Sequence, residues 1–507
     1  MTATLTDTAP RTPDPADRPV RRRAALAGWL WAPVVLLATV AVRAFGNARG
    51  YDVFVDEVTY LRVSESVAQD LGVRLYGEPF FLHPPAMFFL EGGWLTALGP
   101  FPDVIDGVMA ARWLVFLLAG VTAVLAVRLA YVLAGRWAAV ATFVLMLLDP
   151  FLVRINSRNL LETPTLLFVL AGILVLAVPL AREERLTLRR AAAGGALLGL
   201  AVLTKDTAAL AVSLPLLYLL ARRSTRVAAL VAGATLVLTY LPYPLVSALV
   251  GHWDTLVDEK SVGAMRLSGH VQLTGFNAPG AASFSDRIVE RLSFYGASYA
   301  LMAAGGFAAL YLVLRGRPAH RLVGWWSGAS YLLATYSIVR GTLEEQLFYF
   351  VLLPAAVAVP VALATWAARR APRRRRSLVP VWGLVLLAAW TAPAVLSYVE
   401  VHTQRDDAYA QMVGFVDDEL GGRVAPRIGV TSDPASVLLR GSQIFRVSTP
   451  ASVQRQRVDY ILVSTSAVEN GTSSVTPELQ RLIDRSELVH DVEGRSVGSL
   501  QLVRVPR

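Results

Sequence analysis

The sequence predicts an all-α polytopic membrane protein with a small α/β domain at its C-terminal end. The 507 residues are 54% hydrophobic, and their mean hydropathy of +0.49 is too high for a water-soluble globule of this length. Long apolar runs alternate with short connections up to about residue 402. Beyond that point the apolar runs are short and separated by Gly, Ser and Pro, which is typical of strands and turns.

The charge distribution argues against nucleic acid as a partner. The net charge is +10 at pH 7, but the arginines are clustered in the connections between apolar runs. Cytoplasmic loops of membrane proteins carry such an excess of positive charge. The chain has no cysteine, which excludes disulfides and thiolate metal sites.

Residues 1–23 are expected to form a disordered cytoplasmic tail, because they are rich in Pro, Asp and Thr and contain no apolar run. Residues 24–402 are expected to form the transmembrane domain, with about eleven helices. The predicted spans are residues 24–42, 108–134, 136–152, 160–181, 190–204, 207–221, 227–249, 294–314, 322–339, 346–368 and 378–398.

The connections between these spans fall into two alternating sets. One set is strongly basic, and the other holds most of the loop carboxylates. The positive-inside rule places the basic set in the cytoplasm. With an odd number of spans in the cell (plasma) membrane, the N-terminus is then cytoplasmic and the C-terminus extracytoplasmic.

Residues 403–507 are expected to form an extracytoplasmic soluble α/β domain. Residues 406–420 have the pattern of an amphipathic helix, and four short apolar runs at 427–431, 459–464, 487–492 and 499–505 have the pattern of strands. The sequence indicates a packing or acceptor-docking role for this domain. Recruitment of partners by a non-catalytic scaffold is the alternative.

The first outer loop, residues 43–107, is the strongest candidate for a functional segment. Its length of about 65 residues far exceeds that of a tight connection. The Asp56-Glu57 pair precedes an amphipathic stretch, and His83-Pro84-Pro85 precedes a second apolar run, so two interfacial helices are expected. A second long outer loop, residues 251–291, is expected to act as a mobile lid.

Asp56 and Glu57 are the candidate catalytic residues. Adjacent carboxylates at the membrane boundary suit an enzyme in which one accepts a proton from a hydroxyl group and the other positions the substrate or a metal ion. The alternative is a solvated acidic loop. The two prolines after His83 restrict the backbone, so its imidazole is expected to be held in place, where it can donate to a phosphate or coordinate a metal; a purely structural histidine is the alternative.

Further polar residues fall at the same predicted face. Arg158, Asn159 and Glu162 flank the outer ends of two spans, where ionisable groups are costly unless they face a cavity or each other. A structural ion-pair network is the alternative for these three. Lys205 is one of only two lysines and lies at an outer helix end, where its ammonium group suits a phosphate; pairing with Asp206 is the alternative.

Arg112 and Arg340 extend the set of cations that the sequence places near this face. Together with Lys205 and His83 they are predicted to bind the phosphate of an anionic lipid head group. Tyr60 is included in the predicted substrate pocket.

This ordered set of motifs resembles the C-type-fold membrane glycosyltransferases, specifically the protein O-mannosyltransferase and aminoarabinose transferase group. The resemblance covers roughly residues 24–400. It rests on the acidic pair in a long first outer loop, on His83-Pro84-Pro85, on Arg112 within AARW, on the RNLLE segment at 158–162 and on LTKD at 203–206. Aminoarabinose-type members carry Lys before the two prolines, so His83 makes this chain similar to the mannosyltransferase type.

The resemblance implies an inverting transfer of a sugar from a polyprenyl-monophosphate donor to a hydroxyl acceptor on the outer face. The acceptor is expected to be a cell-envelope glycan, lipid or protein. Asp56 would be the general base, Glu57 would assist with acceptor or metal, and Lys205 with Arg112 would hold the donor phosphate. Either no cofactor is required or a divalent ion binds, for which Asp56, Glu57 and Glu162 are the candidate ligands.

A transporter or flippase of a lipid-linked anion is the alternative function. It accounts equally well for the cations, but it gives no role to the acidic pair on the long loop.

Overall fold

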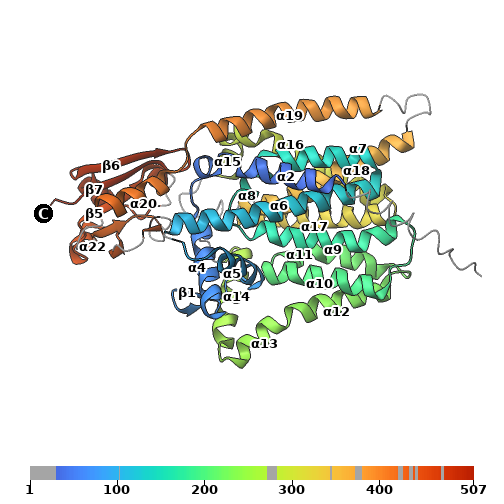
Figure 1. The fold of residues 1–507 in the computed structure, drawn as a ribbon, viewed down its shortest axis with the longest axis horizontal. Coiled ribbons are helices and arrows are strands. Elements are labelled where there is room, and N and C mark those ends of the chain that lie inside the picture. The colour runs from blue at the N-terminus through green and yellow to red at the C-terminus, as the bar shows by residue number, and fades with distance from the viewer. Residues whose placement is uncertain are drawn as a thin grey trace, which may run out of the picture.

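The computed structural model describes residues 30–101, 103–270, 283–342, 345–370, 379–420 and 426–506, with gaps at 433–434, 436–437, 440–442 and 470–472. The predicted tail, residues 1–23, lies outside these ranges. Long helices run parallel to one another in a bundle, and a small domain with a β-sheet stands at one end of it (Figure 1).

Each of the eleven predicted spans corresponds to a helix of the bundle. These are α2 (Ala32–Ala44), α6 (Val104–Ala134), α7 (Arg136–Leu148), α9 (Glu162–Ala181), α10 (Leu188–Thr204), α11 (Ala208–Ala221), α12 (Arg226–Tyr240), α16 (Leu292–Arg315), α17 (Pro318–Arg340), α18 (Phe348–Arg370) and α19 (Val379–Thr403). By length and composition, six spans in the described chain qualify as membrane-crossing, or seven if α7 and α8 (Pro150–Asn156) are counted as one bent span. The structure therefore supports a membrane fold, and the number eleven stays a prediction.

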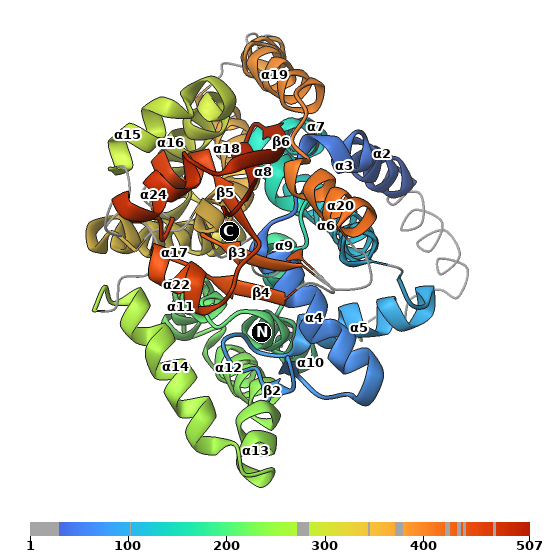
Figure 2. The same ribbon diagram turned by 90° about the vertical axis from the view of Figure 1, so that its left-hand side faces the viewer.

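The remaining elements of this part of the chain are short and connect the bundle helices. They are α3 (Asn47–Gly50), α4 (Val55–Asp70), β1 (Arg74–Leu75), β2 (Glu78–Pro79), α5 (Ala86–Leu98), α13 (Pro242–Leu249), α14 (Trp253–Leu267), α15 (Phe284–Glu290) and η1 (Glu345–Leu347). In a view along the bundle, α4, α5 and α14 lie across its axis (Figure 2). The two helices predicted in the first outer loop are thus α4 and α5.

The second long outer loop, residues 251–291, begins with a helix, and its role as a lid stays a prediction. Residues 253–267 form α14, because a polar stretch with an apolar residue at every third or fourth position is a helical pattern. Residues 271–282 lie outside the described chain.

The C-terminal domain contains one five-stranded sheet. Its elements are α20 (Ala408–Glu419), β3 (Arg427–Val430), β4 (Gln443–Arg446), α22 (Pro450–Arg455), β5 (Tyr460–Ser464), α23 (Thr465–Glu469), α24 (Pro477–Ile483), β6 (Glu487–Gly494) and β7 (Gly498–Arg504). The strand order is β4-β3-β5-β7-β6; β4, β3 and β5 are parallel, and β7 is antiparallel to both its neighbours. The four predicted strands are confirmed. The sequence missed β4, which has only two apolar residues between Gln443 and Arg446.

The first outer loop and the C-terminal domain share one hydrophobic core. Val53, Val58 and Leu61 belong to the same buried cluster as Met412 and Val413 of α20, and the cluster continues into the sheet. The sheet domain is therefore packed directly against the segment that carries the acidic pair.

The chain bends by 62° between α7 and α8 before it reaches the RNLLE segment. Both ends at the break are capped by ionic side chains. The Asp149 carboxylate accepts hydrogen bonds from the N–H groups of Phe151 and Leu152 at the start of α8, and Arg43 of α2 donates to the Met146 carbonyl at the end of α7. Anions at helix N-termini and cations at C-termini complement the helix dipoles. The two side chains therefore stabilise the bend between α7 and α8.

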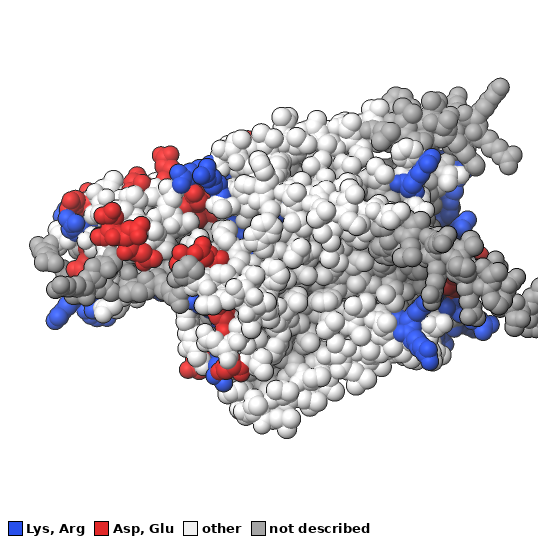
Figure 3. Space-filling model, viewed as in Figure 1, with Lys and Arg blue, Asp and Glu red and all other residues white. Residues whose placement is uncertain are grey.

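Charged residues mark the two ends of the bundle. Arginine side chains gather at the end away from the sheet domain, whereas acidic groups are prominent on the sheet domain and beside it (Figure 3). The white band between the two ends is almost free of charge on the face shown, as expected for a surface in contact with lipid.

Candidate active site

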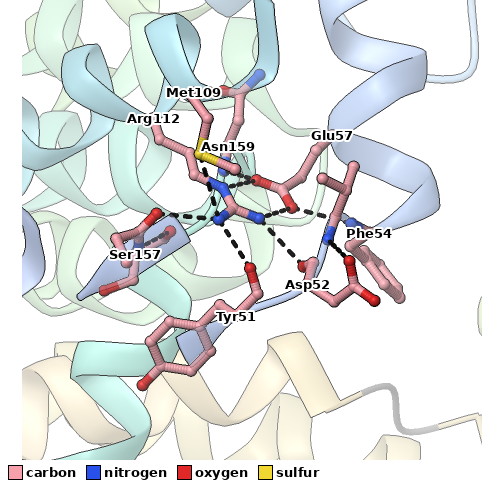
Figure 4. Close-up of polar contacts among 10 residues, drawn as sticks. Tyr51, Asp52, Phe54, Glu57, Met109, Arg112, Ser157 and Asn159 are labelled. Atoms are coloured by element: carbon pink, nitrogen blue, oxygen red, sulfur yellow. Dashed lines mark hydrogen bonds and ion pairs between the residues drawn. The ribbon is translucent and has the colours of Figure 1, made fainter. Parts of the chain in front are cut away.

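Glu57 forms a buried ion pair with Arg112. Both side chains are 0% exposed. Glu57 lies in the first turn of α4, and Arg112 lies in α6. The guanidinium donates to both carboxylate oxygens, from Nε to Oε1 at 2.9 Å and from Nη2 to Oε2 at 2.8 Å (Figure 4). This bidentate geometry is the strongest form of a carboxylate–arginine contact.

The other N–H groups of Arg112 hold the segment that leads into α4. Nη1 donates to the Asn47 side chain and to the Tyr51 carbonyl, both at 2.9 Å, and Nη2 donates to the Asp52 carbonyl at 3.1 Å. One guanidinium thus fixes the backbone of residues 51–52 and the first turn of the helix (Figure 4). The structure places Arg112 in this network, and its predicted role in binding the donor phosphate with Lys205 stays a prediction.

Two backbone N–H groups complete the surroundings of Glu57. Phe54 donates to Oε2 at 3.0 Å, and Asn159 donates to Oε1 at 2.7 Å. Burial by itself would raise the pKa of Glu57, but Arg112, then Arg158 and the Asn159 N–H, lower it below its usual value. Glu57 is therefore ionised, and its oxygens are occupied by protein donors.

Asn159 links Glu57 to a second buried acid. Its side-chain amide donates to Glu91 Oε1 of α5 at 2.8 Å. Burial raises the pKa of Glu91 to about 8, so this acid is protonated at neutral pH. The RNLLE segment is thus tied to both helices of the first outer loop.

Asp56 points away from this network, although it is the neighbour of Glu57. It is partly buried, and its Oδ2 accepts a hydrogen bond from the Gln346 side chain at 3.0 Å. Successive residues of an α-helix are separated by about 100° around the axis, which directs the two carboxylates to different partners. The structure therefore gives the acidic pair two different environments.

Tyr60 lies one turn after Asp56 and on the same face of α4. Its hydroxyl is 3.2 Å from Nε2 of His83. Burial, followed by the charges of Lys205, Lys260 and Arg266, lowers the pKa of His83 well below its usual value. His83 is therefore neutral at pH 7 and surrounded by cations.

Both lysines of the chain lie near His83. Lys205 directly follows the last residue of α10 and forms an ion pair with Glu162, the first residue of α9. Lys260 of α14 forms an ion pair with Asp206 at 2.6 Å and lies 3.5 Å from the Leu82 carbonyl. Sequence reasoning missed Lys260, although its rarity in an arginine-rich chain was the available signal.

The two other predicted arginines, Arg158 and Arg340, have different surroundings. The guanidinium carbon of Arg158 lies 5.7 Å and 5.6 Å from the ring centroids of Tyr51 and Phe54. Arg340 is exposed at the C-terminal end of α17; its carbonyl lies close to Gly269, in the turn after α14.

The three predicted metal ligands do not form a cluster. Within the described residues no group of three or more His, Asp or Glu side chains is arranged to hold a metal ion. Glu57 is bound to Arg112 and Glu162 is bound to Lys205, which leaves Asp56 separate from both.

Comparison with known proteins connects this site to membrane glycosyltransferases. The model of the dolichyl-phosphate-mannose-protein mannosyltransferase family matches residues 98–244, which include Arg112, the RNLLE segment and Lys205. No curated protein matches this sequence significantly.

Solved structures share the architecture at low identity. The archaeal oligosaccharyltransferase AglB from Archaeoglobus fulgidus superposes with a TM-score of 0.60 at 11% identity, over 93% of this chain and 74% of its own. ArnT from Cupriavidus metallidurans, bound to undecaprenyl phosphate, gives 0.56 at 15% identity, over 94% and 98%. The protein has the C-type glycosyltransferase fold.

A third structure with this fold, the arabinofuranosyltransferase AftD from Mycobacteria, gives a TM-score of 0.51 at 15% identity. The alignment covers 94% of this chain but 42% of AftD. The expected resemblance to C-type-fold membrane glycosyltransferases is thus confirmed.

Proposed function

We propose that this protein is an inverting glycosyltransferase that moves a sugar from a polyprenyl-monophosphate donor to a hydroxyl acceptor. The observation that carries the proposal is the arrangement along α4. Asp56 and Tyr60 lie on one face of this helix, and Tyr60 contacts His83, around which both lysines of the chain gather. A carboxylate base and a set of phosphate-binding cations thus lie on the same side of the first outer loop.

The proposed reaction is a single displacement at the anomeric carbon. Asp56 accepts the proton of the acceptor hydroxyl, whose oxygen forms the new glycosidic bond. The bond between the anomeric carbon and the phosphate oxygen breaks, and its electron pair leaves with the polyprenyl phosphate. Lys205 and Lys260 stabilise the charge that develops on this phosphate. Attack opposite the leaving group inverts the anomeric configuration.

Glu57 and Arg112 act as positioning residues in this proposal. Because the two side chains bind each other, we assign them this role in place of the acceptor, metal and phosphate contacts expected from the sequence. Because Arg112 also holds the Tyr51 and Asp52 carbonyls, the ion pair fixes the first turn of α4 and with it the backbone of Asp56.

We place the site on the extracytoplasmic side of the membrane. The arginine-rich end of the bundle is opposite the end that carries α4 and the sheet domain (Figures 1 and 3). The positive-inside rule assigns the arginine-rich end to the cytoplasm. The donor, acceptor and C-terminal domain are then all outside.

The test is sugar transfer in proteoliposomes that contain a polyprenyl-phosphate-linked sugar. Asp56→Asn is expected to lower turnover by about 10²- to 10⁴-fold, because the general base is lost. Asp106→Asn, at an exposed aspartate in the first turn of α6, is the matched control and is expected to keep wild-type turnover. Undiminished turnover in Asp56→Asn removes Asp56 from this role. Movement of intact donor across sealed vesicles, without its consumption, supports a flippase.

A further inference from the structure

Arg158 is a buried cation with no hydrogen-bonding partner for its Nε among the described residues. It lies between α8 and α9, and only 7% of its surface is exposed. The rings of Tyr51 and Phe54 lie 5.7 Å and 5.6 Å from its guanidinium carbon. Contacts with aromatic rings stabilise a guanidinium and leave its N–H groups able to form hydrogen bonds.

The carboxylates whose charges act on Arg158 are engaged elsewhere. Glu57 is bound to Arg112, and Asp406 accepts hydrogen bonds from Arg495 and from both the N–H and the hydroxyl of Ser496. The described chain has no ion pair at Arg158 with any carboxylate.

A second cation increases the positive charge at this place. The pKa of Arg158 is lowered to about 10, mainly by burial and secondly by the positive charge of Arg154. Arg154 lies over the rings of Phe151 and Tyr295, at 5.9 Å and 5.5 Å. An unpaired buried charge beside a like charge is unfavourable by several kcal/mol, so the site is organised for an anion that is not part of the protein.

The charges that act on Arg158 differ from those that act on His83. The charges that act on His83 come from Lys205, Lys260 and Arg266, whereas those that act on Arg158 come from Arg154, Glu57, Arg112 and Asp406. Along the chain, Asp56 lies between Phe54, which contacts Arg158, and Tyr60, which contacts His83. Asp56 therefore lies in the segment of chain that connects the two cationic groups.

We propose that Arg158, with Arg154 beside it, binds an oxyanion of the acceptor, and that the acceptor is a hydroxyl compound carrying a phosphate or carboxylate. The inference rests on the proposed function, in which the lysine side holds the donor phosphate. The planar fork of Arg158 matches two oxygens of such a group. Binding there places the acceptor beside Asp56, which takes up the proton of its hydroxyl.

The test uses the full chain in nanodiscs saturated with undecaprenyl phosphate, with inorganic phosphate as the probe. Phosphate binding is measured by calorimetry at constant ionic strength, with chloride as the control anion. The wild type is expected to bind phosphate while the lipid stays bound. Arg158→Gln is expected to weaken phosphate binding at least tenfold, and Arg158→Lys by a smaller factor because it keeps the charge but loses the fork.

Lys260→Gln is the matched variant for the other cationic group. It is expected to weaken binding of undecaprenyl phosphate and to leave phosphate binding unchanged. If the wild type binds phosphate only in the absence of the lipid, the inference is overturned, because phosphate and lipid then compete for a single anion site. Wild-type phosphate affinity in Arg158→Gln and Arg158→Lys also overturns it.

The two proposals fail in different ways. If the wild type does not bind undecaprenyl phosphate, the proposed function is overturned. If the lipid binds but phosphate does not bind beside it, only the anionic acceptor is excluded. The wild-type measurement alone decides this point, even if a variant at the buried Arg158 does not fold.

Discussion

At the scale of single residues, the central feature is that neighbours in sequence have different roles. Asp56 and Glu57 are adjacent, yet Glu57 is locked by Arg112 and Asp56 contacts Gln346. The sequence predicted an acidic pair acting together, because residue types and spacing do not show which way each side chain points. Helical geometry separates the two, and only the packed partners decide which one is buried.

Glu57→Gln is expected to destabilise the protein by about 3–5 kcal/mol, because it leaves the charge of Arg112 buried and unpaired. The measurement is the unfolding temperature of the purified protein. Asp56→Asn is the matched control, since it neutralises the adjacent carboxylate outside the ion pair. Equal effects of Glu57→Gln and Asp56→Asn would contradict a structural role for the pair.

The pKa of His83 predicts a pH dependence of stability. Since the pKa of His83 in the folded state lies well below its usual value of 6.5, the unfolded chain binds a proton in a range where the folded chain does not. The contribution of His83 is fully present above about pH 6.5 and is lost as the pH falls, by up to about 1.4 kcal/mol per pH unit.

The check is the unfolding temperature of the wild type and of His83→Gln at pH 7.5 and pH 5.5. The wild type is expected to lose more stability than the variant between these values. Other groups titrate in this range, among them Asp52, whose pKa is raised to about 6 by burial, but they are common to both proteins. If the unfolding temperatures of the two proteins fall equally between pH 7.5 and pH 5.5, His83 is protonated in the folded state and this prediction is wrong.

At the scale of elements, close contact between helices depends on glycine. In α10, a methyl group on Gly195 would overlap the backbone of Ala232 in α12. Small residues let helix backbones approach in this way within membrane bundles. The adjacent α9 and α10 show the same feature, since a methyl group on Gly172 would lie 3.0 Å from the Gly194 carbonyl.

Gly195→Ala is expected to destabilise the protein by about 1–3 kcal/mol, because α10 and α12 must move apart. Gly233→Ala, in α12, is the matched control: a methyl group there meets nothing within 4 Å, and the change is expected to be neutral or slightly stabilising. Thermal unfolding of the two variants checks the prediction. A loss of stability in Gly233→Ala equal to that in Gly195→Ala would mean that the contact between these helices is not the cause.

At the scale of the whole molecule, the C-terminal domain supports the candidate active site. Met412 and Val413 of α20 pack with Val53 and Val58 of the first outer loop, and the Tyr409 N–H donates to the Asp52 side chain at 3.0 Å. Asp52 in turn offers its carbonyl to Arg112. A continuous set of contacts thus runs from the sheet domain to the ion pair of Glu57.

Met412→Ala is therefore expected to lower sugar transfer and to make the first outer loop more sensitive to protease, as well as costing about 2–5 kcal/mol of stability. Leu479→Ala is the matched control, because Leu479 is equally buried but belongs to a separate cluster on the other side of the sheet domain. It is expected to destabilise the domain while transfer per folded molecule stays near the wild-type value. Equal loss of transfer per folded molecule in both variants would contradict the direct link.

The sequence alone determined the membrane class, the positions of the bundle helices, four of the five strands and the segments of the candidate site. These features depend on local composition and periodicity, which are present in the chain before it folds. Only the tertiary structure decided that Arg112 binds Glu57, that Lys260 of α14 lies near His83 with Lys205, and that Arg158 lies near the rings of Tyr51 and Phe54. Each of these depends on which helix faces are packed together, and side chains far apart in sequence meet only when the bundle has formed.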